Sequence, residues 1–160
     1  MSDLSYMDEY NRVIRYHERF KKINEGKIHD ENSENSRDDV YSFFIHCYQL
    51  KDWIKNDPRT GIDSSTVEMF VHDNLALKIC GDISNGVKHL ILDRPKVGDG
   101  AEMQGSHLSV FLGNQEPILR VKYNIEAGGT THNAFDVATE AVNLWTEFLK
   151  SHVRGFNTQI

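Results

Sequence analysis

The sequence predicts a mainly α-helical protein, an antiparallel four-helix bundle with a β-hairpin inserted before the last helix. In four segments, apolar side chains recur at the three- and four-residue spacing of an amphipathic helix. These segments span about residues 4–25, 36–54, from 65 to an end between 85 and 92, and 135–149. Residues 106–125 instead contain two runs with the two-residue alternation of a strand. An isolated hairpin is only marginally stable, so we expect it to pack on the helices.

The predicted ends of the helices depend on capping residues. Gly26 is expected to end the first helix. Ser36-Arg37-Asp38-Asp39 resembles a capping box at the start of the second helix, and Ser65-Thr66-Val67-Glu68 is an S-x-x-E capping box at the start of the third. We expect Thr131 or Asn133 to cap the last helix, directly after the hairpin.

Length and composition bound the class of protein. A chain of 160 residues is expected to form a single domain, here residues 1–160. Its net charge of −6 argues against strong non-specific binding to nucleic acid. No run approaches the ~18 apolar residues that a membrane span needs, and the N-terminus lacks the basic and apolar regions of a signal peptide. The sequence therefore predicts a cytoplasmic protein that does not interact with a membrane.

No pattern in the sequence indicates a metal or a cofactor. Cys47 and Cys80 are isolated within apolar helical segments, and we expect them to be buried thiols. The histidines, cysteines and glutamates show none of the H-x-x-x-H, C-x-x-C or E-x-x-H spacings of metal sites. We therefore expect neither a bound metal nor a cofactor.

The end of the third predicted helix carries the most informative residues. Lys78, Asp82, Asn85 and His89 share one face of an otherwise apolar helix. An unsatisfied buried polar group costs about 1–3 kcal/mol, so these side chains must be hydrogen-bonded or functional. In the functional interpretation, His89 is a general acid or base, Asn85 orients it or binds phosphate, and Lys88 supplies charge. In the structural interpretation, Asn85 and His89 bond to backbone at a frayed helix end, while Asp82 pairs with Lys78.

A second polar face lies on the second predicted helix. There Tyr48 and Asp52 follow Tyr41 by seven and eleven residues, so the three side chains share one face. If the second and third helices are antiparallel neighbours, Asp52 lies near the start of the third helix and Tyr41 near its end. Tyr48 and Asp52 then join Lys78, Asp82 and Lys88 as candidate binding residues. Alternatively, Asp52 is a solvated surface acid and Trp53 anchors the core.

Two motifs carry a resemblance to known proteins. Residues 47–54 and 79–89 resemble an uncharacterised bacterial family in which an LKDWI-type helix precedes an NG-x-KH helix. More distantly, the predicted fold resembles the higher eukaryote and prokaryote nucleotide-binding (HEPN) superfamily, whose members include dimeric, metal-independent ribonucleases with an R-N-x-x-x-H motif. Asn85 and His89 match that motif, but Ser84 replaces its arginine. Serine cannot hold a phosphate bidentately, so the motif is degenerate.

These observations predict a non-catalytic binding or interaction protein, and the superfamily resemblance implies that it belongs to a bacterial defence or stress system, similar to a toxin–antitoxin protein. Its expected partners are another protein, RNA or a nucleotide, and the superfamily resemblance implies a homodimer. The alternative is a metal-independent endoribonuclease that uses His89, and a third hypothesis is a small-molecule binder with its pocket between hairpin and bundle. An exposed His89 in a basic cleft would favour the ribonuclease, whereas a buried His89 would favour a structural role.

Overall fold

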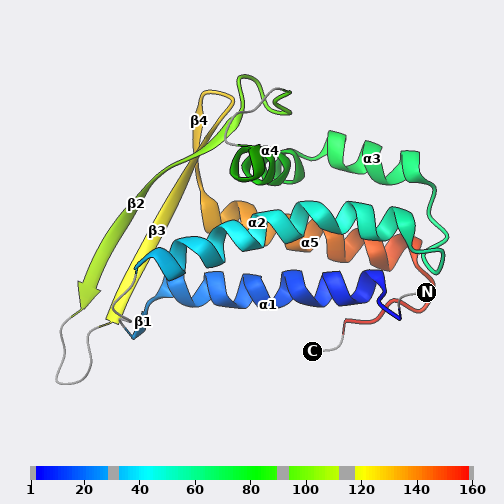
Figure 1. Cartoon of the computed structure of the whole chain (residues 1–160), viewed down its shortest axis with the longest axis horizontal. Coiled ribbons are helices and arrows are strands. Elements are labelled where there is room, and N and C mark those ends of the chain that lie inside the picture. The colour runs from blue at the N-terminus through cyan, green and yellow to red at the C-terminus, as the bar shows by residue number, and fades with distance from the viewer. Residues whose placement is uncertain (1–2, 29–32, 90–93, 112–117, 159–160) are drawn as a thin grey trace.

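A computed structural model describes residues 3–28, 33–89, 94–111 and 118–158. The described residues form five α-helices and four β-strands (Figure 1). The helices are α1 (Tyr6–Glu25), α2 (Ser33–Asn56), α3 (Ser64–Asp73), α4 (Leu75–His89) and α5 (Ala134–His152). The strands are β1 (Lys27–Ile28), β2 (Ala101–Phe111), β3 (Ile118–Ala127) and β4 (Thr130–Asn133). The predicted mainly helical class with a hairpin before the last helix is confirmed.

The arrangement of the helices differs from the predicted one. In Figure 1, α1, α2 and α5 lie side by side, while α4 is seen nearly end-on and so crosses α2. The third predicted helix is two helices, α3 and α4, which meet at Asn74. Asn74 has extended backbone angles, and its side-chain amide donates to the carbonyl of Phe70 at 2.7 Å. Asparagine competes with helical hydrogen bonds in this way, which explains why one apolar pattern forms two helices.

Two predicted caps are confirmed and two are wrong. Gly26 ends α1, and the Asn133 side chain accepts from the backbone N–H of Asp136 at the start of α5. Ser36 instead lies inside α2, because that helix begins at Ser33. Ser65 lies inside α3, because the extended residue before that helix is Asp63.

A capping box that the sequence analysis missed begins α1. The side chain of Ser5 accepts from the backbone N–H of Met7, and the backbone N–H of Ser5 donates to the carboxylate of Asp8 at 2.6 Å. Aspartate here takes the place of the usual glutamate or glutamine, so the motif did not match S-x-x-E.

The β2–β3 hairpin is longer than predicted and belongs to a small antiparallel sheet. Its register runs from Ala101 opposite Ala127 to Phe111 opposite Ile118, with an irregularity between Met103 and Gly105. Strands β1 and β4 both pair with β3, at opposite ends of that strand. Gly128 and Gly129 form the two-residue turn between β3 and β4, and both have positive φ, as glycine tolerates. In Figure 1 the hairpin lies against one end of the helical layer.

The helices and strands share one hydrophobic core, which contains Cys47 and Cys80 as expected. Trp145 is 1% exposed, and its indole N–H donates to the carbonyl of Cys47 at 3.0 Å. Leu149, Cys80 and Ile83 belong to the same core. Burial, together with the neighbouring Cys47 thiol, raises the pKa of Cys80 well above its ordinary value. Within the described residues, we find no helix with the length and apolarity needed to cross a bilayer.

Candidate functional site

The polar face predicted on the third helix runs from the core to the surface of α4. Asp82 is fully buried, Lys78 and Asn85 are partly buried, and Lys88 and His89 are exposed. These side chains therefore do not share one environment. His89 is exposed, which is one of the two conditions of the ribonuclease interpretation, and the interpretation that buries it does not hold. The other condition, a basic cleft around His89, is not met by the cavities described below, because His89 lines neither of them.

Asp82 holds the segment that connects α4 to β2. Its Oδ1 accepts from the backbone N–H of Lys96 at 2.8 Å, and its Oδ2 accepts from those of Val97 at 3.1 Å and Ala101 at 3.2 Å. We call residues 94–100 the strap, since they cross α4 at this point. Among the described residues no ion pair joins Asp82 to Lys78, so the pairing considered from the sequence is replaced by three backbone contacts.

Gly81 lets the strap lie close to α4. A Cβ atom at Gly81 would come within 2.8 Å of the Lys96 side-chain carbons and of the Tyr48 ring. The Lys96 side chain therefore crosses the helix where a side chain is absent. Its Nζ lies 5.4 Å from the centroid of the Tyr48 ring, a cation–π contact, and the Nζ of Lys51 lies 4.9 Å from the same centroid.

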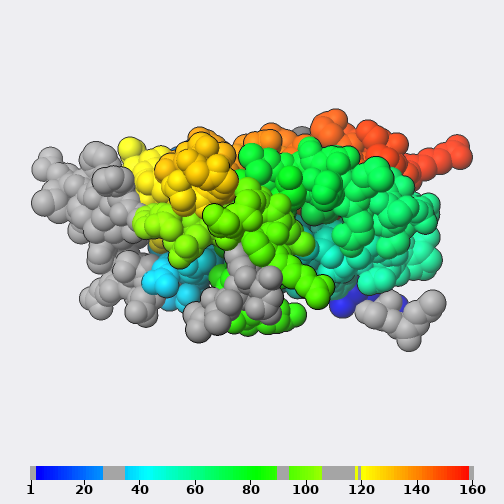
Figure 2. Space-filling view, turned by 90° about the horizontal axis from the view of Figure 1, so that it is seen from above, coloured from blue at the N-terminus to red at the C-terminus, as the bar shows by residue number. Residues whose placement is uncertain are grey.

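Beside the strap lies a cavity of about 640 Å³, which we call the lysine cavity. Its wall combines α2, α3, α4 and the strap, through Tyr48, Ser65, Glu68, Met69, Val71, His72, Lys78, Pro95 and Lys96. Viewed from above, the strap lies at the surface next to α3 (Figure 2). Tyr48 and Lys78 were predicted as binding residues, and the structure places both in this wall.

The lining of the lysine cavity contains two lysines and one glutamate, although the chain as a whole is acidic. In the described part of the chain, no carboxylate forms an ion pair with the Nζ of Lys78 or Lys96. The one acid among the lining residues, Glu68, contacts Lys51 and Lys55. Lys78 and Lys96 thus line the cavity without an ion-pair partner among the described residues.

Asp52 lies in an ion-pair cluster that links α2 to α3. Its Oδ1 lies 2.9 Å from the Nζ of Lys51 and 3.0 Å from that of Lys55, and Lys55 also contacts Glu68. Burial alone would raise the pKa of Asp52, but the hydrogen bonds from the two lysines lower it. The Lys55 hydrogen bond lowers the pKa of Glu68. Asp52 therefore lies near the start of the third predicted helix, as expected.

A second cavity lies near the C-terminal end of α4. A cavity of about 600 Å³ is lined by Arg37 and Tyr41 of α2 and by Asp82 and Gly86 of α4, among others. Tyr41 thus lies near the end of α4, as predicted. Asn85, Lys88 and His89 line neither this cavity nor the lysine cavity.

Lys96 and Gly81 are the site residues that sequence analysis missed. The strap has no apolar period, so nothing in its pattern distinguishes Lys96. Gly81 did offer a signal, because a glycine inside a helix costs about 1 kcal/mol and often has a packing reason.

No family model, no curated protein and no solved structure matches this chain. In the described ranges, no three histidine, cysteine, aspartate or glutamate side chains are grouped so that they could hold a metal ion.

Proposed function

We propose that this chain is a non-catalytic binding protein whose lysine cavity holds a nucleotide-sized anion. The observation that carries the proposal is that Lys78 and Lys96, which have no carboxylate partner among the described residues, line one cavity. This happens in a protein whose net charge is −6, so the local positive charge is not a consequence of overall composition.

The chemistry of the wall suits a ligand with a charged and an apolar part. Lysine ammonium groups bind phosphate oxygens as point charges. The Met69 side chain is 64% exposed, and with Pro95 and the Tyr48 ring it offers apolar surface for a base. A volume of about 640 Å³ lies within the usual range of about 300–1,000 Å³ for small-molecule sites.

The wall is held in place before any ligand arrives. Asp82 fixes the strap through three backbone hydrogen bonds, and the cluster of Asp52, Lys51, Lys55 and Glu68 fixes α3 against α2. A preformed wall supports binding because less conformational entropy is lost on association.

Calorimetric titration with ADP, ATP and inorganic phosphate tests the proposal. Lys78→Met and Lys96→Met each remove one charge but keep the alkyl chain, which for Lys96 preserves the packing at Gly81. A charged hydrogen bond is worth about 1.5–3 kcal/mol, so each variant should bind about tenfold more weakly or worse. Lys88→Met, on an exposed part of α4 outside the cavity, is the matched control and should bind normally. Equal affinity for all three variants, or no binding of any probe, contradicts the proposal.

A metal-independent ribonuclease is the second candidate, and the exposure of His89 favours it. The test is cleavage of RNA in the presence of a chelator, with His89→Ala expected to abolish it and Asn85→Ala to weaken it less. If the wild-type protein leaves RNA intact, this candidate is wrong and the binding proposal is unaffected.

A further inference from the structure

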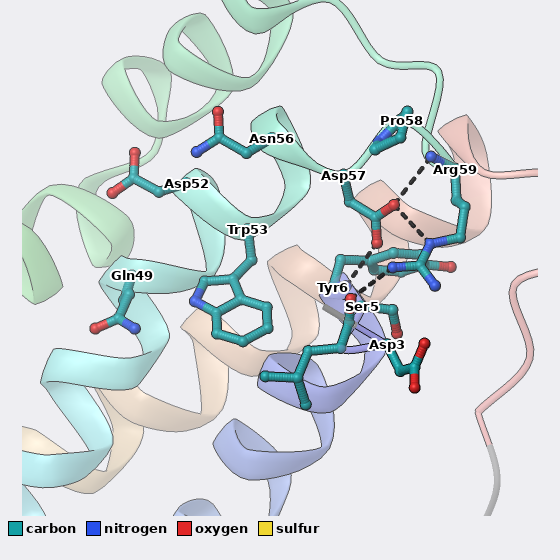
Figure 3. Close-up of a pocket in the computed structure, with 11 residues that line it drawn as sticks. Asp3, Ser5, Tyr6, Gln49, Asp52, Trp53, Asn56, Asp57, Pro58 and Arg59 are labelled. Carbon is teal, nitrogen blue, oxygen red and sulfur yellow. Dashed lines mark hydrogen bonds and ion pairs between the residues drawn. The ribbon is translucent and has the colours of Figure 1, made fainter. Parts of the chain in front are cut away.

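A larger cavity, of about 880 Å³, lies on the other side of Asp52 (Figure 3). It is bounded by the C-terminal half of α2, by residues 3–6 at the start of α1, and by the turn after α2 at 57–59. In Figure 3, Gln49, Asp52, Trp53 and Asn56 come from successive turns of α2, and Ser5, Asp57 and Arg59 lie across from them. We call it the tryptophan cavity.

One wall of the tryptophan cavity is built around Asp57. This carboxylate accepts from the backbone N–H of Tyr6 at 2.9 Å, from that of Arg59 at 3.0 Å, and from Nε of Arg59 at 2.7 Å. Nη2 of Arg59 also donates to the carbonyl of Leu4 at 2.6 Å. Burial alone would raise the pKa of Asp57, but the hydrogen bonds from Arg59 and Tyr6 lower it. The wall is therefore tied together, and its charges are paired.

The opposite wall carries hydrogen-bonding groups that are not used. Within the described residues, the structure records no protein group as a hydrogen-bond partner of the Gln49 amide, the Asn56 amide or the Trp53 indole N–H. These groups are open to solvent, since Asn56 is exposed, Gln49 and Trp53 are partly exposed, and none of the three is an unsatisfied buried group. Trp145 differs, since its N–H is satisfied in the core. Each amide offers both donors and an acceptor. Seven residues separate Gln49 from Asn56, which is about 10 Å along a helix, and Trp53 lies between them.

The charges of this wall do not favour an ion. Both Lys51 and Lys55 contact Oδ1 of Asp52, so the negative charge of this carboxylate is compensated by two ammonium groups. Its Oδ2 remains as a hydrogen-bond acceptor. Arg59, the one cation among the residues that line the cavity, is engaged with Asp57. No lining cation is left to bind a phosphate, and the remaining acid, Asp3, would repel one.

We propose that the tryptophan cavity binds a saccharide. The C–H face of a pyranose ring packs on an indole ring. The guanidinium carbon of Arg12 lies over the Trp53 ring, 6.0 Å from its centroid, and the ring is partly buried against the core, so the sugar would contact the part of the ring that remains exposed. The sugar hydroxyls both donate and accept, as the Gln49 and Asn56 amides require, and Oδ2 of Asp52 accepts a further hydroxyl. A disaccharide is about as long as the stretch of α2 from Gln49 to Asn56, about 10 Å along the helix axis. This site does not depend on the lysine cavity or on the function proposed for it.

Intrinsic fluorescence gives a direct assay, because the chain has only two tryptophans and Trp145 is buried. Titration with maltose, lactose and N,N′-diacetylchitobiose should change the Trp53 emission saturably for at least one of them. Calorimetry should find that Asn56→Ala and Trp53→Ala bind that sugar at least about tenfold more weakly. Asn11→Ala, an exposed asparagine of α1, is the matched control and should bind normally.

Two results overturn the proposal. One is the lack of a saturable change with all three disaccharides at millimolar concentration. The other is unchanged affinity in both Asn56→Ala and Trp53→Ala, with circular dichroism showing that they remain folded. Lys78→Met and Lys96→Met should leave saccharide binding intact, so a failure of the nucleotide proposal is distinguishable from a failure here.

Discussion

Replacing Asp82 with asparagine should release the strap from α4. The carboxylate is fully buried and accepts three backbone hydrogen bonds, two of them through Oδ2. Asparagine has the same shape, but only one of its two terminal atoms is an acceptor. With its oxygen in the place of Oδ2, the amide nitrogen faces the N–H of Lys96, and that hydrogen bond is lost.

The expected cost follows from this geometry. A hydrogen bond to a charged group contributes about 1.5–3 kcal/mol, and the two bonds that remain lose the charge of their acceptor. We expect Asp82→Asn to lower the free energy of unfolding by about 3 kcal/mol. For a domain of this size, 1 kcal/mol shifts the melting temperature by about 2–4 °C, so Tm should fall by about 6–12 °C.

Two measurements check this expectation. Urea unfolding followed by circular dichroism gives the free energy, and hydrogen exchange should show faster exchange at the amides of Lys96, Val97 and Ala101. Asp99→Asn, on an exposed part of the same strap, makes the same change in charge and should leave both unchanged. If Asp82→Asn keeps the wild-type midpoint and the protection of those amides, the carboxylate does not hold the strap.

Three further predictions concern stability. Burial lowers the pKa of His17 from its ordinary 6.5, so the native state binds fewer protons than the unfolded state. The free energy of unfolding should therefore fall as the pH drops below about 6.5. His17→Gln should flatten this pH dependence in urea unfolding, and an unchanged slope would contradict the assignment to His17. Trp145→Ala should cost about 3–5 kcal/mol in the same assay, and unchanged melting would show that α5 does not pack on the core. Ser5→Ala should lower the free energy of unfolding by about 1 kcal/mol, because the Ser5 side chain caps α1. Ser65→Ala should lower it little, because the Ser65 side chain does not cap α3. Equal losses for the two variants would mean that the caps are misassigned.

Local sequence predicted most helices and the hairpin because their signals depend on residues a few positions apart. Gly26 and Asn133 show this well, since each acts on backbone groups within four residues. Asn74 is the exception. Its side chain competes for the carbonyl of Phe70, but the apolar period continues on both sides of it, so the pattern alone predicts one helix.

The sequence selected only some of the residues that line the candidate sites. Helical spacing selected Tyr48 and Lys78 as candidates, and both line the lysine cavity. The same spacing also grouped Asp82 with His89, although the structure buries one and exposes the other. A shared helical face does not determine what covers each turn of the helix.

The sequence by itself therefore determined the helical class, the hairpin and the helix ends at Gly26 and Asn133, and it selected two residues that line the lysine cavity. Tertiary structure decided the role of Asp82, whose hydrogen-bond partners lie 14 to 19 residues further along the chain. It also decided the place of Lys96 and the tryptophan cavity, which joins α2 to the start of α1. Periodicity reports only which side of an element faces the core, whereas these features depend on which distant segment packs there.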